Sequence, residues 1–254
     1  MDRNDGTTDK TSEKQTKVRS ISASVKSKDC MVIFLKRKRI LVQMEFHMKR
    51  KSRRRLLRGI TGLIASAGLT GKVATAANPT PGAAEGPFYP EPSMRAPDDD
   101  NNLVKISGLV EAAGGEVFTL RGRLTGCDGR PLAEHRIEIW QCDVNGKYQH
   151  TADNRSVAYD HAFQGFGHDI TDTDGSYVFR TIKPTIYPGR APHIHVKVFK
   201  EDQELLSTQL YIKGHPANVA DGLFNRLAAS QADAVSMVFV KGDTGTEATI
   251  DIVV

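Results

Sequence analysis

Apolar and polar residues alternate along most of the chain after residue 117. The segments "VFTLRGRL" (117–124) and "HRIEIWQC" (135–142) place an apolar residue at every second position. This is the period of a half-buried β-strand. Between them, "TGCDGRPLAE" contains the Asp-Gly pair and the proline that are typical of a turn. The pattern therefore predicts two strands joined by a turn.

The same alternation continues to the C-terminus. It predicts further strands within residues 172–184, 193–199, 206–212, 235–240 and 248–254. The segment 215–230, "HPANVADGLFNRLAAS", reads as helical, with Pro216 near its start. Short strands separated by turn signals are typical of all-β sandwiches and barrels. We expect an all-β domain over residues 117–254, an antiparallel β-sandwich with short helical and loop excursions.

Residues 77–116 lack this alternation and predict an N-terminal arm and loop. Within them, "EGPFYPEP" (85–92) places Phe88 and Tyr89 between prolines. Such a segment is stiff, and its aromatic rings are expected to pack on a surface. That surface belongs either to the same subunit or to a neighbouring copy, so the pattern leaves a homo-oligomer open.

Charge is divided unevenly along the 254 residues, although the net charge is +5. Residues 1–58 contain 18 Lys/Arg and 6 Asp/Glu, whereas residues 77–254 contain 16 Lys/Arg and 24 Asp/Glu. A nucleic-acid-binding domain carries its basic residues on the folded part. The acidic body therefore argues against a nucleic-acid partner and assigns the basic character to a leader.

The leader has the parts of an export signal in the expected order. A basic block (52–58) precedes a mildly apolar, glycine-rich run (59–71), and Ala74-Thr75-Ala76 offers small residues for cleavage. The apolar run is too short to span a bilayer. The arginine cluster followed by leucines resembles a twin-arginine signal. The alternative, a basic amphipathic helix on a membrane surface, is disfavoured by the glycines.

This resemblance implies a signal peptide over residues 48–76, recognition by the twin-arginine translocase, and a periplasmic or secreted protein that begins near Ala77. No stable membrane span is expected. Residues 1–47 are polar and basic, and we expect them to be disordered or to lie upstream of a true start at Met48. In an oxidising compartment Cys127 and Cys142 would either form a disulfide or remain two free thiols, and the sequence favours neither.

Candidate chemistry is concentrated in "YPGRAPHIHVKV" (187–198). Residues i and i+2 of a strand project from the same face, so His193 and His195 can reach one ion. Such a pair alone is weak evidence, because paired strand histidines more often face solvent. Tyr187 lies six residues before the first histidine, and Tyr148 follows the Asn145-Gly146 turn signal.

Two tyrosines beside two histidines point to a hard trivalent ion. A phenol has an unperturbed pKa of about 10, and a strongly charged ion favours its oxyanion form. Two tyrosinates and one hydroxide would neutralise Fe(III), and two neutral histidines would complete the coordination. A neutral centre can be buried without the desolvation penalty of a naked charge.

The strings "WQCDVNGKY" (140–148) and "DTDGSYVFRTIKPTIYPGRAPHIH" (172–195) together resemble the core of the intradiol ring-cleavage dioxygenases, a non-haem Fe(III) family. The resemblance runs from about residue 85 to the C-terminus, and "GPFYP" is similar to the arm of the protocatechuate branch. It implies that ferric iron, Fe(3+), is held by four ligands: Tyr148, Tyr187, His193 and His195. It also implies an active-site arginine, Arg190, a glutamine beside the substrate, Gln209, and a tryptophan near the site, Trp140.

The implied activity is cleavage of a catechol-type ring between its two hydroxyl-bearing carbons with O2, which yields a muconate-type dicarboxylate. In this scheme Tyr187 leaves the metal and accepts a catechol proton, and Arg190 stabilises the developing negative charge. The loop "PGRAP" is shorter than in typical protocatechuate enzymes, and Gly189 stands where an aromatic residue is common. Both departures concern the substrate pocket and leave the substrate open.

Two alternatives remain at this point. A zinc or copper site could use the same histidines, but it would need a cysteine or carboxylate ligand. A non-catalytic, exported β-sandwich binding module would share the architecture, because function resides in the site and not in the fold. Under these alternatives Trp140 is a packing residue, Gln209 a sheet-surface amide and Arg190 an ordinary salt-bridge partner.

Overall fold

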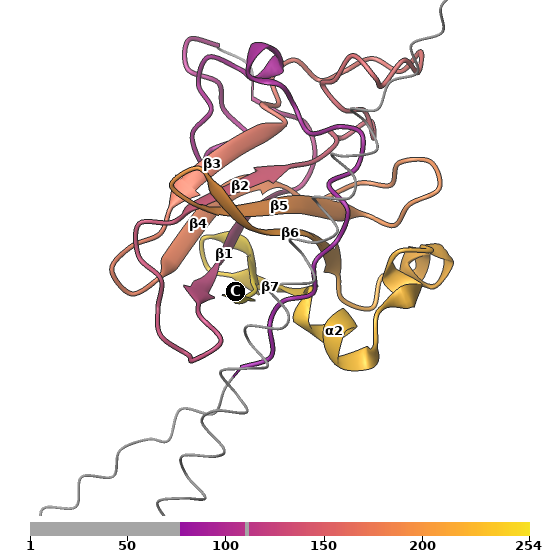
Figure 1. Ribbon diagram of the computed structural model, residues 1–254. Coiled ribbons are helices and arrows are strands. Elements are labelled where there is room, and N and C mark those ends of the chain that lie inside the picture. Colours follow the sequence, from indigo (N-terminus) through magenta and orange to yellow (C-terminus); the bar gives the residue numbers. More distant parts are fainter. Residues whose placement is uncertain (1–76, 110–111) are drawn as a thin grey trace, which may run out of the picture. The chain divides into compact units, whose positions relative to one another are not determined.

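The computed structural model describes residues 77–109 and 112–254, which belong to one compact unit (Figure 1). The predictions for residues 1–47 and for the signal peptide at 48–76 lie outside the described residues. Among the helices of the described part, none is long and apolar enough to cross a membrane.

Nine strands form the sheet within the described residues. They are β1 (Val117–Thr125), β2 (Arg136–Trp140), β3 (Phe166–Ile170), β4 (Ser176–Ile182), β5 (His193–Lys200), β6 (Gln203–Ile212), β7 (Ser236–Gly242), β8 (Gly245–Thr249) and β9 (Ile252–Val253). Their order is β3-β2-β5-β6-β7-β8-β1-β4, with β9 beside β1. Most neighbours are antiparallel, whereas β1 pairs with β8 and β9, and β6 with β7, in parallel.

The sheet curls until its two end strands meet. The backbone N–H of Val178 on β4 donates to the Asp169 carboxylate on β3 at 2.8 Å. This contact nearly closes the sheet into a barrel-like sandwich, so the predicted all-β class is confirmed. Strand β3 was not predicted, because "FGHDI" has no alternation; its pairing with β2 forms the strand.

The prediction of one helix over residues 215–230 is wrong, because the segment is divided into three short helical pieces. The segment contains two 3-10 turns, η2 (Pro216–Ala220) and η3 (Phe224–Arg226), followed by the short helix α2 (Ala229–Ala234). A third turn, η1 (Pro92–Met94), lies in the arm. Asp221 interrupts the helix, because its carboxylate accepts the backbone N–H groups of Leu223 and Phe224 at 2.9 and 3.0 Å. An aspartate that bonds nearby N–H groups competes with helical hydrogen bonding.

Strand β5 is buried on both faces. Ile194, Val196 and Val198 point into the main hydrophobic core and are at most 1% exposed. The alternate residues, His193, His195 and Lys197, project from the opposite face, as the period of two requires. The face that carries His193 and His195, which would face solvent in most strands with paired histidines, is therefore covered.

The arm provides this cover, and it contacts its own chain (Figure 1, purple). Glu85 forms an ion pair with Lys197, which is 5% exposed. The Tyr89 hydroxyl donates to Glu138 at 2.6 Å, and the Gln209 side-chain amide donates to the Ala84 carbonyl at 3.0 Å. The arm thus lies across β5, β2 and β6.

Candidate metal centre

The two histidines lie in the centre of the sheet. The register places His195 opposite Trp140 of β2 and Gln209 of β6, and His193 opposite Tyr211. Their side chains are buried, and their Nε2 atoms lie 3.1 Å apart. The indole of Trp140 stacks on the His195 ring with centroids 4.7 Å apart. Both imidazoles therefore point to one location below the arm.

Both histidines are neutral. Burial, and then the charge of Arg190, lowers the pKa of His193 to about 4, and burial lowers the pKa of His195 well below its ordinary value. The Nδ1 atom of His193 lies 2.7 Å from the Ala191 carbonyl oxygen, and this contact requires the proton on Nδ1. The Nε2 atom of His193 therefore carries a lone pair and no proton, as a metal ligand must.

Tyr148 comes from the loop after β2 and is 3% exposed. Its ring lies against the ring of Phe88 with centroids 4.6 Å apart, and 6.1 Å from the ring of His195. Its hydroxyl oxygen is buried and has no hydrogen-bond partner among the described residues. Burial raises the pKa of this phenol well above 10. A buried oxygen without a hydrogen-bond partner lowers the stability of the fold. A bound cation would provide the missing partner.

Tyr187 comes from the turn before β5 and is half-buried. The turn is closed by the Arg190 backbone N–H, which donates to the Tyr187 carbonyl at 3.1 Å. The Tyr187 ring lies 5.7 Å from the ring of Tyr148 and 6.1 Å from that of His193, between centroids. The structure thus brings together the four residues that the resemblance nominated as iron ligands.

The donor set fits a hard, highly charged metal ion. It combines imidazole nitrogens of neutral histidines with phenol oxygens, one of which has no partner in the part of the chain that the structure describes. Across residues 77–109 and 112–254, no group of three or more His, Cys, Asp or Glu side chains is placed to hold a metal. The third ligand that a zinc or copper site would need is therefore missing from the described residues.

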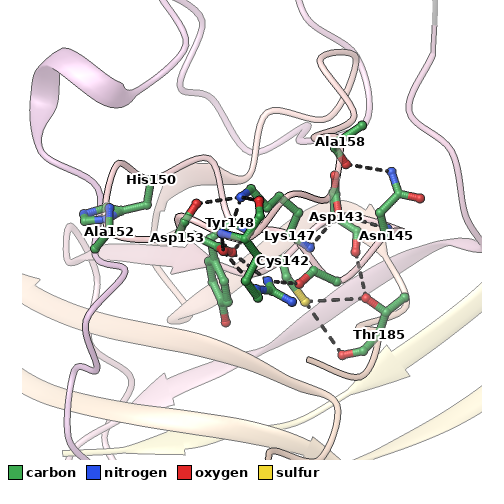
Figure 2. A network of polar contacts seen from close by, with 12 residues as sticks. Cys142, Asp143, Asn145, Lys147, Tyr148, His150, Ala152, Asp153, Ala158 and Thr185 are labelled. Carbon is green, nitrogen blue, oxygen red and sulfur yellow. Dashed lines mark hydrogen bonds and ion pairs between the residues drawn. The ribbon is translucent and has the colours of Figure 1, made fainter. Parts of the chain in front are cut away.

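A network of polar contacts holds the Tyr148 loop (Figure 2). The Asp153 carboxylate accepts the Tyr148 backbone N–H at 2.9 Å and forms ion pairs with Lys147 at 3.3 Å and Arg155 at 2.7 Å. Its side chain is 1% exposed. Burial alone would raise the pKa of Asp153, but hydrogen bonds from Arg155, Tyr148 and Lys147 hold it well below its usual range. The loop is therefore fixed by a buried, ionised carboxylate.

The two tyrosine-bearing loops touch each other. The Thr185 hydroxyl donates to the Asp143 carbonyl at 2.7 Å, and the Cys142 sulfur lies 3.5 Å from the same hydroxyl (Figure 2). Cys142 is a free, buried thiol, so the Cys127–Cys142 disulfide that the sequence left open does not form. Gly146 has φ +70°, and a Cβ there would lie 2.5 Å from the Ile186 carbonyl oxygen. Glycine permits this approach.

Arg190 lies beside the histidines and is held at both ends. Its Nε donates to Asp221 at 2.9 Å, and its Nη2 donates to Gln209 at 2.5 Å and to the Tyr211 hydroxyl at 3.1 Å. Arg190 is therefore not a free surface cation, and Gln209 is not a sheet-surface amide, since it is 1% exposed. The structure places both nominated residues next to the donor cluster.

Sequence reasoning missed two residues of this site. Asp153 accepts the Tyr148 backbone N–H, and Asp221 accepts the Nε–H of Arg190. Phe88, which was expected to pack on a surface, covers the Tyr148 ring. The Asp221-Gly222 pair inside a helical pattern is a turn signal that could have been used. Asp153 carries no comparable signal, because its role depends on contacts with the chain around it.

An all-β fold that gathers two neutral histidines and two tyrosines has the donors of a non-haem metal protein. A family model described as "Dioxygenase" matches residues 84–254, which is more than half of the chain. The chain therefore belongs to this dioxygenase family.

Two curated relatives show the range of names in this family. The chain is 36% identical over 133 residues to the protocatechuate 3,4-dioxygenase beta chain of Burkholderia cepacia, covering 49% of this chain and 57% of that one. It is 30% identical over 158 residues to the hydroxyquinol 1,2-dioxygenase of Nocardioides simplex, covering 55% and 49%. The matches span about half the length of these curated relatives.

Solved structures agree with the fold. The dioxygenase domain of a dioxygenase carbohydrate-binding protein fusion from Streptomyces sp. SirexAA-E is 34% identical, with a TM-score of 0.53, and the match covers 70% of this chain and 98% of that one. An intradiol ring-cleavage dioxygenase from Tetranychus urticae is 20% identical, with a TM-score of 0.55 and coverage of 70% and 94%. The second likeness concerns the fold alone.

Proposed function

We propose that the protein is an Fe(III)-dependent intradiol ring-cleavage dioxygenase that acts on a catechol-type substrate with O2. The observation that carries this proposal is the donor set: two neutral histidines on β5 and two tyrosines on adjacent loops. One of these tyrosines has a buried hydroxyl without a partner within residues 77–109 and 112–254. Family membership supports the same reaction class.

When bound, ferric iron supplies a Lewis acid that favours oxyanion ligands and draws electron density from a coordinated catechol. Tyr148, Tyr187, His193 and His195 would hold it. Tyr187, as the phenolate that iron would hold, is the residue suited to accept a proton from a catechol hydroxyl at its phenolate oxygen, because the turn that carries it borders solvent at Ile186. Tyr148 is clamped through its backbone and stays in place.

The remaining residues prepare the surroundings for negative charge and keep water out. Arg190 presents a guanidinium whose orientation is set before substrate arrives. A fixed cation in a low-dielectric site stabilises charge that develops during reaction without reorganising at that moment. Phe88 and Trp140 form apolar walls against Tyr148 and His195. Gly86 lets the arm approach, because a Cβ there would lie 3.3 Å from His195.

The two alternatives are less well supported. A zinc or copper centre would need a third ligand that the described residues do not bring near His193 and His195. A pure binding module gives no reason to bury two histidines beside an orphaned phenol oxygen, because buried polar groups without partners destabilise a fold.

Iron and colour test the proposal directly. The purified protein should contain stoichiometric iron and be red-brown from tyrosinate-to-Fe(III) charge transfer, and it should consume O2 with catechol, protocatechuate or hydroxyquinol. Each of these three is named in a relative of this chain. Colourless protein that contains zinc would contradict the proposal, as would colour retained after replacing both Tyr148 and Tyr187 with phenylalanine.

The location of the enzyme is a separate proposal, which rests on the leader sequence alone. We propose export by the twin-arginine route, directed by residues 48–76. Replacing Arg53, Arg54 and Arg55 with lysine should retain the protein in the cytoplasm, as measured by cell fractionation. Unchanged export of this variant would overturn the proposal.

A further inference from the structure

Asp221 is a buried carboxylate without an assigned role. Its side chain is 0% exposed, and it lies between η2 and η3, thirty-one residues after Arg190. It is also the residue that interrupts the predicted helix. An ionised side chain in such a place needs partners that compensate its lost hydration.

The Asp221 carboxylate has four such partners, two on each oxygen. Oδ1 accepts the backbone N–H groups of Leu223 and Phe224 at 2.9 and 3.0 Å. Oδ2 accepts Arg190 Nε and the Ala191 backbone N–H, both at 2.9 Å. Burial alone would raise the pKa of Asp221, but these donors hold it below its usual range. The backbone N–H groups of Leu223 and Phe224 therefore fix the carboxylate independently of the Arg190 side chain.

The opposite edge of Arg190 is also fixed. Its Nη2 donates to Gln209 and Tyr211, and the Gln209 amide in turn donates to the Ala84 carbonyl of the arm. A guanidinium is planar and presents its donors in a rigid fork. Contacts at Nε and at Nη2 together therefore set the plane of the group, and not only its position.

We propose that Asp221 is the positioning residue for Arg190, which sets the guanidinium plane beside the histidines so that its charge faces the reacting ring. This inference rests on the proposed function of Arg190. The reason for a carboxylate is orientation: a misplacement of about 1 Å in a catalytic group can cost about 100-fold in rate. Asp221 acts through Arg190 and has no contact with substrate in this scheme.

The test uses Asp221→Asn in the full chain, with iron content, kcat and KM measured on the best catechol substrate. The asparagine retains an acceptor for Leu223 and Phe224 but loses the charge that holds Arg190. We expect kcat to fall about 100-fold, with KM and iron content little changed. The matched control is Asp233→Asn on α2, whose ion pair with Lys213 is exposed, and it should match the wild type.

A double variant tests the coupling. If Asp221 acts through Arg190, then Asp221→Asn/Arg190→Ala should be no slower than Arg190→Ala alone, because residues that act as a unit are non-additive. Fully multiplicative losses would overturn the proposal. So would a wild-type kcat in Asp221→Asn, or a loss confined to iron content.

Hydrogen exchange in the wild-type protein tests the proposal without an activity assay. It therefore remains informative if the variant fails to fold or if the enzyme assay fails. In iron-free, 15N-arginine-labelled wild-type protein, the Arg190 Nε–H should exchange with solvent far more slowly than that of Arg130, whose side chain is 83% exposed. Equal exchange rates would overturn the positioning role. Slow exchange with no ring cleavage of any catechol would support positioning and reject the proposed function.

Discussion

The loops that carry Tyr148 and Tyr187 face the same site but are built differently. Tyr148 is almost fully buried, its backbone N–H is bound by Asp153, and its ring is covered by Phe88. Tyr187 lies in a turn whose neighbour Ile186 is 59% exposed, and a Cβ at Gly189 would meet no atom within 4 Å. One loop is packed and clamped, and the other borders open space.

This difference assigns different tasks to the two phenols. The Tyr148 loop cannot shift without breaking a buried ion pair, and such breaks cost several kcal/mol. A turn with open space beside it can change its side-chain position at little cost. We therefore expect Tyr148 to be the permanent ligand and Tyr187 the one that moves to accept a proton. The following predictions test this comparison.

The largest effect is expected for Tyr148→Phe. Removing the anchored ligand should abolish iron binding and the visible colour, and lower kcat/KM by about 1000-fold or more. Metal analysis, absorbance and O2 uptake measure these losses. Iron and colour at wild-type levels would show that Tyr148 is not a ligand.

Tyr187→Phe should be the milder change. The variant is expected to retain iron with weaker colour, while kcat falls about 100-fold because the proton acceptor is lost. The same three measurements apply. If iron is lost as completely as in Tyr148→Phe, the division between an anchored and a mobile tyrosine is wrong.

Asp153→Asn should loosen the Tyr148 loop. Breaking a buried ion pair by removing one partner costs about 3–5 kcal/mol, and urea unfolding of the iron-free protein measures the loss. The control is Glu247→Gln, which removes a surface pair with Arg121 whose side chains are 34% and 50% exposed; it should cost at most about 1 kcal/mol.

The pH dependence of this difference has a definite sign. The folded pKa of Asp153 is depressed below the usual 3.8, so its stabilising contribution is present above pH 3.8 and is lost as pH falls further. The gap between the wild type and Asp153→Asn should therefore be constant near neutral pH and shrink in acid. A gap that is independent of pH down to the acid limit of folding would contradict the clamp.

A pair of glycine variants gives the smallest expected difference. Both Gly146 and Gly189 have positive φ, +70° and +81°, but a Cβ at Gly146 would collide with the Ile186 carbonyl. Gly189→Ala should cost about 1–2 kcal/mol from backbone strain alone. Gly146→Ala should cost more and also separate the loops. Equal costs in urea unfolding would show that the loops are not packed against each other.

Much of the site could be predicted because its signals are local. Strand alternation places His193 and His195 on one face, and the spacing of Tyr187 and Arg190 ahead of them carries the family resemblance. The core residues Ile194 and Val196 follow from the same period. These features depend on neighbouring residues, so a single sequence contains them.

The remainder depends on contacts between distant segments. Strand β3 forms through its pairing with β2, and the 215–230 segment is broken by a carboxylate that also binds Arg190. The role of Asp153 likewise arises from a loop closing on itself. These structural features are determined by tertiary packing, which overrides local propensity.

The arm that covers β5 has a kinetic consequence. Its contacts join residues very far apart, such as Gln209 with Ala84 and Thr208 with Pro81, separated by 125 and 127 positions. Contacts of this sequence separation carry a high loop-closure cost, and folding slows where they dominate. We expect the sheet and its tyrosine loops to form first and the arm to dock last, which leaves a short-lived opening through which a metal ion can reach His193 and His195 before the site closes.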